Sequence, residues 1–134
     1  MTAEEKIDEI KNKNILVTGG CGFIGSEVVK QLSKLGANIT IIDNLSSGKE
    51  DYVKGLPNTE LIIAELSDLE QLKKSVKNKD YVIHLAALPF IPDSYYYPMK
   101  FFDVNVNATI GLVLESIKEK KIKRFVHISS SEVY

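Results

Sequence analysis

The fold of this chain is decided by the stretch Thr18-Gly19-Gly20-Cys21-Gly22-Phe23-Ile24-Gly25. It follows the apolar run Ile15-Leu16-Val17 and opens a segment in which apolar residues recur at helical spacing. Missing Cβ atoms let a backbone approach a phosphate closely, and a helix N-terminus supplies free N–H groups and positive potential. A strand that gives way to glycines and then to a helix therefore predicts a phosphate-binding turn.

A carboxylate further along the chain makes this prediction more specific. Asp43 follows Gly25 by 18 residues and ends a second apolar run, residues 39–42. In a dinucleotide site, an acid at this position accepts hydrogen bonds from the hydroxyls of the adenosine ribose. The turn also matches the G-x-G-x-x-G pattern at Gly20, Gly22 and Gly25. Turn and acid together favour a dinucleotide site over the alternative, a glycine-rich turn in an unrelated α/β protein.

Apolar runs alternate with helical patterns along the rest of the chain. We expect strands over residues 14–18, 38–43, 59–64, 81–85 and 124–128, and helices over residues 23–35, 68–77 and 97–119. Strands that are near-continuous apolar runs indicate a buried parallel sheet. The expected fold is α/β, a Rossmann-like doubly wound parallel sheet in three α/β/α layers, with strand order 3-2-1-4-5. We expect this sheet to be incomplete at its C-terminal edge.

Local signals place the helix ends and the buried faces. Gly36 is positioned to end the helix over residues 23–35 as its C′ residue, and Ser67 with Glu70 predicts a capping box for the next helix. One face of the helix over residues 23–35 is apolar at helical spacing and is formed by Ile24, Val28, Val29, Leu32 and Leu35.

Composition narrows the class of protein. The chain has 134 residues, enough for one domain with a single core. A net charge of −1, with Lys and Arg spread along the chain, predicts neither a nucleic-acid partner nor a membrane partner. One cysteine, Cys21, excludes an internal disulfide and favours a reducing, cytoplasmic location. A redox role for this thiol is left open, and no metal site is predicted.

Six blocks of sequence occur in one order and spacing. They are Thr18–Gly25, Asp43–Gly48, Glu65–Asp68, His84–Ala87, Asn105–Asn107 and Ser129–Tyr134. Together they resemble the extended short-chain dehydrogenase/reductase family, in its nucleotide-sugar epimerase/dehydratase branch. The resemblance runs from about Asn14 to the last residue. It implies that residues 1–134 are an NAD-binding domain with a leading segment over residues 1–13, without the substrate lobe.

The resemblance also implies a set of cofactor residues. They are Gly19, Gly22, Phe23, Ile24, Gly25, Asp43, Asn44, Ser47, Glu65, Leu66, Leu85, Ala86, Ala87 and Asn105. The glycine loop would hold the pyrophosphate of NAD, Asp43 the adenosine ribose, and Glu65 would lie near adenine. The residues alone leave open that Glu65 is a solvated acid at a helix entry and that Asn105 is an exposed helix residue. His84 and His127 lie inside apolar strands, and we interpret both as core histidines.

Ser130, Ser131 and Glu132 are the expected catalytic residues. Members of the family also use a Tyr-x-x-x-Lys pair after the serine, and we expect the isolated chain to be inactive without it. The match from Tyr96 to Lys100 precedes the serine and contains Pro98, so we interpret it as chance. The expected function is the NAD(H)-binding domain of an enzyme that oxidises a nucleotide sugar transiently to a 4-keto sugar. The alternative is a stand-alone, non-catalytic dinucleotide-binding module.

Glu132 bears on the choice between epimerase and dehydratase. The order Ser130-Ser131-Glu132 resembles the 4,6-dehydratases and glucuronate decarboxylases of the family. Once C4 of a sugar is a ketone, the C5 proton is acidic and a carboxylate can remove it as a general base. A 4-epimerase needs no such base, and a solvent-facing turn residue is also possible here, so both reactions stay open. The expected partners are a nucleotide-sugar substrate and a second copy of the chain, which associates as a homodimer or along the uncovered sheet edge.

Overall fold

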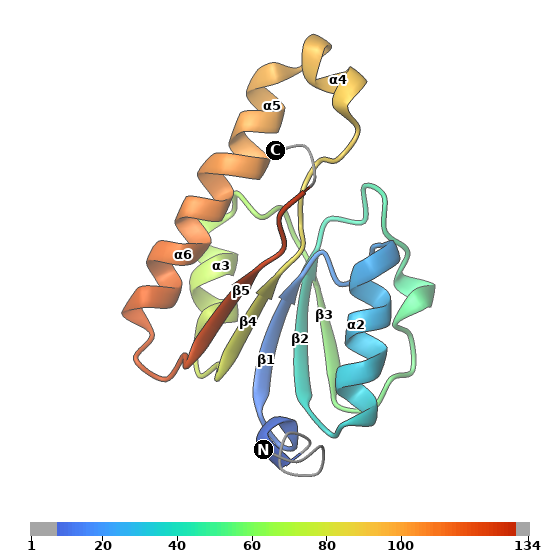
Figure 1. The fold of residues 1–134 in the computed structure, drawn as a ribbon, viewed down its shortest axis with the longest axis vertical. Coiled ribbons are helices and arrows are strands. Elements are labelled where there is room, and N and C mark those ends of the chain that lie inside the picture. The colour runs from blue at the N-terminus through green and yellow to red at the C-terminus, as the bar shows by residue number, and fades with distance from the viewer. Residues whose placement is uncertain (1–7, 131–134) are drawn as a thin grey trace.

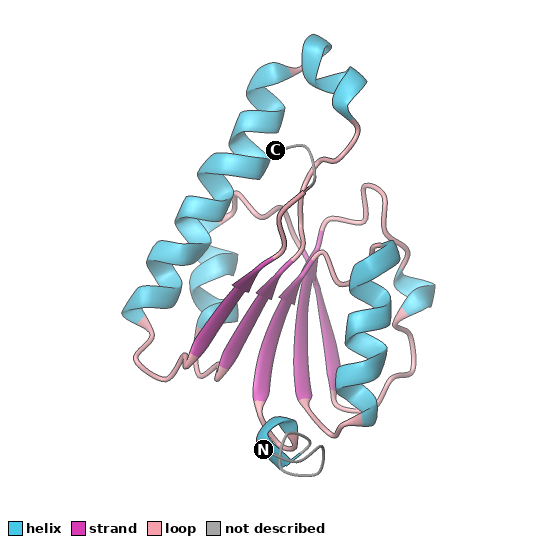
Figure 2. Cartoon of the chain, viewed as in Figure 1, coloured by secondary structure: helices cyan, strands magenta, loops and turns pink. Residues whose placement is uncertain are grey.

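The chain folds around one parallel sheet. The computed structural model describes residues 8–130. Its strands are β1 (Asn14–Thr18), β2 (Asn38–Asp43), β3 (Thr59–Ile63), β4 (Tyr81–His84) and β5 (Arg124–His127). They pair in parallel in the order β3-β2-β1-β4-β5, and their arrowheads point the same way in Figure 2. The strand order expected from the sequence is confirmed. Within the described residues β5 pairs with β4 alone, so its outer edge is open.

Helices cover both faces of this sheet (Figure 1). On one face lies α2 (Phe23–Lys34), and on the other lie α3 (Leu69–Val76) and α6 (Ala108–Lys118). A short 3₁₀ turn, η1 (Glu50–Tyr52), interrupts the loop between β2 and β3. The three layers place the carboxyl ends of all strands at one edge of the molecule.

Alternation along β1 shows why both faces are buried. Ile15 and Val17 join the apolar cluster that contains Val29 of α2. Leu16, between them, joins the opposite cluster, which contains Leu112 of α6. Since successive side chains of a strand point to opposite faces, the consecutive apolar residues Ile15, Leu16 and Val17 supply side chains to both covered faces.

A helical arm rises past the carboxyl edge of the sheet (Figure 1). It consists of α4 (Ile91–Tyr96), α5 (Pro98–Phe102), a π-helical turn η2 (Asp103–Asn107) and then α6. The expected helix over residues 97–119 is confirmed as this run from α5 onward, whereas α4 lies where no helix was expected. Tyr97 leaves helical geometry, with φ −130° and ψ 53°, before Pro98 begins α5. Among the described residues, no helix has the length and apolarity that crossing a membrane requires.

The N-terminus of α3 differs from the expected capping box. The N-cap is Asp68, whose Oδ1 accepts hydrogen bonds from the backbone N–H groups of Glu70 and Gln71, both at 3.1 Å. The prediction of Ser67 as the cap was wrong because the helix begins one residue later. Aspartate caps a helix as well as serine does, and its charge also interacts favourably with the helix dipole.

Gly36 ends α2 as expected. Its φ is +78°, and its N–H donates to the carbonyl of Ser33 at 3.0 Å. The N–H of Ala37 donates to the carbonyl of Leu32 at 3.1 Å, which completes a Schellman motif. The left-handed conformation at Gly36 favours glycine because a Cβ there would crowd the following carbonyl oxygen.

Two glycine-to-alanine changes should therefore have opposite effects on stability. We expect Gly36→Ala to lower the free energy of unfolding by about 1–2 kcal/mol, the cost of a side chain in this conformation. Gly111→Ala, inside α6, should raise it by up to ~1 kcal/mol, because a Cβ there meets Leu69 Cδ2 at an ordinary 3.4 Å. Urea unfolding of the two variants measures both values. If both substitutions changed the free energy of unfolding in the same direction, the left-handed conformation of Gly36 would be contradicted.

Candidate dinucleotide site

A cleft of about 670 Å³ opens at the carboxyl edge of the sheet. It is lined by the glycine loop, the ends of β2 and β3, the loop after β4, the helical arm and the end of β5. Since β2 and β4 flank β1 on opposite sides, the cleft lies at the topological switch point, where open α/β sheets bind ligands. Its lining includes, of the expected cofactor residues, Gly19, Phe23, Ile24, Gly25, Asp43, Asn44, Ser47, Glu65, Leu66, Leu85, Ala86, Ala87 and Asn105.

Gly22 is the expected cofactor residue that does not line the cleft. It is instead the N-cap of α2, and its carbonyl accepts a hydrogen bond from the N–H of Ser26 at 2.9 Å. Having no side chain, Gly22 cannot cap the N–H groups of the first helical turn itself. These groups therefore remain for a ligand.

Close backbone contacts explain the glycines of the loop. A Cβ on Gly25 would overlap the carbonyl oxygen of Gly19. Gly19 has a φ of +71°, and a Cβ there would lie 2.8 Å from the backbone nitrogen of Ala86. The glycines thus allow the loop to lie directly against α2 and against the segment that follows β4.

The first turn of α2 faces the cleft instead of the core. Phe23 is 92% exposed and Ile24 is 61% exposed, and both line the cleft. The first turn of α2 lies at the carboxyl edge, where the cleft opens, and only later positions such as Val29 reach the sheet.

Asp43 holds the glycine loop in place. Its side chain is buried, Oδ2 accepts a hydrogen bond from the N–H of Cys21 at 2.9 Å, and Oδ1 accepts one from the N–H of Leu45 at 2.8 Å. Each carboxylate oxygen can accept a second hydrogen bond. Asp43 can therefore tie β2 to the loop and still accept bonds from two hydroxyls of a ligand.

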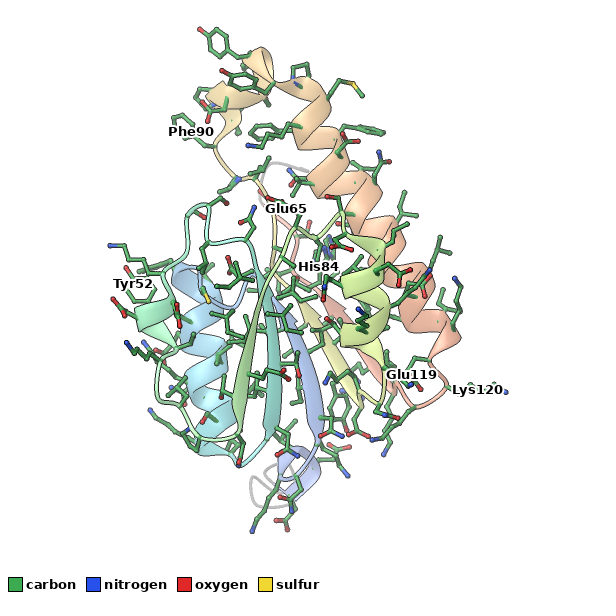
Figure 3. All side chains as sticks on the ribbon, turned by 180° about the vertical axis from the view of Figure 1, so that it is seen from behind. Tyr52, Glu65, His84, Phe90, Glu119 and Lys120 are labelled. Atoms are coloured by element: carbon green, nitrogen blue, oxygen red, sulfur yellow. The ribbon has the colours of Figure 1, made fainter. Side chains whose placement is uncertain are left out.

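Glu65, which is labelled in Figure 3, follows the end of β3 and pairs with Asn44 after the end of β2. The Nδ2 of Asn44 donates to both carboxylate oxygens of Glu65, at 3.2 and 3.1 Å. Both residues line the cleft, at the ends of β3 and β2. Glu65 is exposed, but this contact distinguishes it from a lone solvated acid at a helix entry.

Asn105 holds the side of the cleft that is formed by the loop after β4. Its Oδ1 accepts a hydrogen bond from the N–H of Leu88 at 2.8 Å, and its Nδ2 donates to the carbonyl of Leu88 at 3.1 Å. The side chain therefore holds the loop after β4 against the helical arm, and the alternative of an exposed helix residue is excluded.

The thiol of Cys21 is unsuited to redox chemistry. Burial, followed by the negative charges of Asp43 and Glu50, raises the pKa of Cys21 to about 11. A reactive thiol needs a lowered pKa and some exposure. Cys21 acts here as a small buried residue of the loop.

Comparison with known proteins identifies the family. Residues 15–134 match the profile described as the NAD dependent epimerase/dehydratase family. The chain belongs to this family.

Individual members of the epimerase/dehydratase family agree with this assignment. The UDP-glucose 4-epimerase of Lacticaseibacillus casei is 34% identical, over 90% of this chain and 36% of the relative. The UDP-N-acetylglucosamine 4-epimerase from Methanobrevibacter ruminantium M1, solved with UDP-N-acetylmuramic acid, is 42% identical with a TM-score of 0.86, over 92% of this chain and 40% of that structure. The Bordetella bronchiseptica enzyme WbmF, solved with NAD⁺, is 29% identical with a TM-score of 0.82, over 94% of this chain and 41% of that structure. The chain thus spans well under half the length of these relatives.

The expected catalytic residues lie at the end of the described chain. Ser130 is exposed and lines the cleft beyond β5. Ser131 and Glu132 lie outside the described residues. His127 is exposed because β5 is the edge strand, so its interpretation as a core histidine was wrong. His84 is 1% exposed and fully hydrogen bonded, as expected for a core histidine.

Sequence reasoning missed part of the cleft wall. Phe101 and Thr109 both line the cleft, and each lies four residues from Asn105 in the chain. Residues four apart share one face of a helix, so helical spacing around Asn105 would have found them.

The burial of His84 should appear in the pH dependence of stability. Burial, with a smaller effect of His127, lowers the pKa of His84 from 6.5 to about 4. The unfolded chain then binds a proton that the native chain does not, so stability is lost as the pH falls from about 6.5 to about 4. The expected loss is roughly 3 kcal/mol. Urea unfolding across this range, compared with His84→Gln as the control for carboxylate titration, measures it. Equal pH slopes for the two proteins would contradict a buried neutral imidazole.

Proposed function

We propose that this chain is the NAD-binding domain of a nucleotide-sugar epimerase or dehydratase. The observation that carries the proposal is the buried carboxylate of Asp43, bound to the N–H of Cys21 in the glycine loop at the mouth of the switch-point cleft. Membership of the NAD dependent epimerase/dehydratase family and the NAD⁺ in the related WbmF structure support it. The proposed domain comprises residues 1–134, with residues 1–13 as a leading segment.

The residues of the cleft fit this cofactor. The glycines let the loop lie directly against α2 and Ala86, and the free N–H groups at the start of α2 suit a pyrophosphate. Asp43 suits the ribose hydroxyls, and Asn44, Ser47, Glu65 and Leu66 suit the adenosine end. Leu85, Ala86, Ala87 and Asn105 form the wall for the other half of the dinucleotide.

NAD, when bound, supplies a reversible hydride acceptor for a sugar C–H bond. We propose that the whole protein uses it to form a 4-keto sugar transiently and then to reduce that sugar again. Ser130, at the rim of the cleft, would hydrogen bond to the reacting hydroxyl, with Ser131 and Glu132 following it. The family's tyrosine and lysine would complete the proton transfer, so the isolated chain should bind cofactor without turnover.

The proposed partners are a nucleotide sugar and a second copy of the chain. Exposed apolar side chains on α6, those of Ile110, Leu114 and Ile117, support association with a second copy. Their spacing places them along one face of the helix. A cytoplasmic location is part of the same proposal, and the presence of a single cysteine supports it.

The first prediction of this proposal is a preference for NAD(H) over NADP(H). Asp43 would repel a 2′-phosphate, and the next cation along the chain is Lys49. Asp43→Asn keeps one acceptor oxygen but removes the charge, so we expect about tenfold weaker NAD binding and a smaller preference. Glu119→Gln, at the far end of the sheet in Figure 3, is the matched control and should bind as the wild type does. Calorimetric titration of both cofactors tests this. Tighter binding of NADP(H), or unchanged NAD affinity in Asp43→Asn, would refute the assignment.

The second prediction separates the two reactions in the complete enzyme. If Glu132 is a general base, incubation with the nucleotide sugar in D₂O should place deuterium at C5, and Glu132→Gln should lose this exchange by about 10²-fold or more. The control is Glu119→Gln, which should exchange normally. Absence of C5 exchange in the wild type, with C4 inversion intact in Glu132→Gln, would establish the epimerase reaction instead.

A further inference from the structure

We propose that His84 is a positioning residue of the cofactor cleft, which acts through the hydroxyls of Thr18 and Thr109 to hold the loop after β4 against the glycine loop and the helical arm. The inference rests on the proposed function, because it takes the cleft to be the NAD site. His84 itself does not line the cleft, so its effect on a ligand is indirect.

The imidazole of His84 bridges β1 and α6. Its Nδ1 lies 2.6 Å from Oγ1 of Thr18, and its Nε2 lies 2.8 Å from Oγ1 of Thr109. Thr18 is the last residue of β1, directly before the glycine loop, and is fully buried. Thr109 lies in α6 and lines the cleft. One buried ring thus connects the loop at the centre of the sheet with the helix that forms one wall.

The direction of each hydrogen bond follows from its neighbours. Thr109 Oγ1 donates its proton to the carbonyl of Asn105 at 3.0 Å, so it must accept from Nε2–H of His84. Nδ1 is then unprotonated and accepts from the hydroxyl of Thr18. That hydroxyl in turn accepts from the N–H of Ala86 at 3.2 Å. A single neutral tautomer of His84 thus satisfies all four of these hydrogen bonds.

This network holds both ends of the loop after β4. Thr18 binds the start of the loop through the N–H of Ala86. Asn105, whose carbonyl ends the network, binds Leu88 through both amide atoms of its side chain. The segment between these contacts lines the cleft and lies directly against Gly19. Loss of one side chain from this hydrogen-bond network should therefore change the position of the segment from Ala86 to Leu88.

The surroundings of His84 favour the neutral form of its ring. Its other neighbours are the rings of His127 and Phe125 from β5, with centroids 5.2 and 6.2 Å away. Burial lowers the pKa of His84 to about 4, so the ring is neutral at ordinary pH. A neutral ring is what the pattern of donors and acceptors requires.

The segment from Ala86 to Leu88 belongs to one half of the cleft. Asp43 and Glu65 lie on the β2–β3 side of the glycine loop, whereas Ala86, Leu88 and Asn105 lie on the β4–β5 side. AMP can occupy the first half alone, and NAD must occupy both. A positioning role therefore predicts that a broken network weakens NAD binding but leaves AMP binding unchanged.

Thr18→Val and Thr18→Ser form the test pair, because Thr18 does not line the cleft. Valine keeps the shape of threonine and removes the hydroxyl, so we expect NAD affinity of the chain to fall by roughly tenfold with AMP affinity within about twofold. Serine keeps the hydroxyl and should restore NAD affinity. Nitrogen-15 spectra of His84 should show one neutral Nε2–H tautomer in the wild type and in Thr18→Ser, and a changed Nδ1 signal in Thr18→Val.

The outcomes separate this inference from the proposed function. Equal losses for AMP and NAD in Thr18→Val, or unchanged binding of both, would overturn the positioning role while the wild type still binds NAD. A wild type that binds neither ligand would overturn the proposed function and the inference with it. If Thr18→Val does not fold, His84→Gln applies the same comparison, because the side chain of His84 does not line the cleft either.

Discussion

The close approach of α2 to the glycine loop is the contact on which the rest of the site depends. Gly25 lies so near the carbonyl of Gly19 that no side chain fits between them. This contact places the N-terminus of α2 over the end of β1, at the centre of the sheet, and directs its free N–H groups into the cleft. A larger residue at Gly25 would displace the helix, and with it the wall formed by Phe23 and Ile24.

Two buried polar groups then hold the loops on either side of this centre. On the β2 side, the carboxylate of Asp43 binds the glycine loop at Cys21. On the β4 side, the imidazole of His84 binds Thr18 at the root of the same loop. One group is charged and has lone pairs left for a ligand, whereas the other is neutral and uses all of its bonds within the protein. The cleft is thus held on both sides, and among the described residues its charged side chains, Asp43 and Glu65, lie on the β2–β3 side.

The strand order and most of the cleft could be predicted from the sequence because they follow from local patterns. Apolar runs identify the strands, and the glycine loop with Asp43 identifies the site. The exposure of two side chains could not be predicted in this way. Ile24 shares helical spacing with the apolar face of α2, but it is 61% exposed in the cleft, at the edge of the sheet. His127 has the apolar neighbours of a core strand, but its strand lies at the edge of the described sheet. Burial of these two side chains depends on which elements lie next to them, and spacing along the chain does not contain that information.

The π-helical turn over Asp103–Asn107 has a consequence for how this arm can vary. A π turn holds one residue more than the α-helical turn it replaces, and each residue of an α-helix advances the side chains by about 100° around its axis. Deletion of a single residue from the turn would close it into a regular α-helix and leave the faces of α5 and α6 where they are, because the extra residue is absorbed within the turn. Leu112 would then stay in the core and Phe101 beside the cleft. Deletion of one residue from the regular part of α6 would instead rotate all later side chains by about 100°, so an alignment that places a one-residue gap there and not in the turn would misassign the faces of the arm.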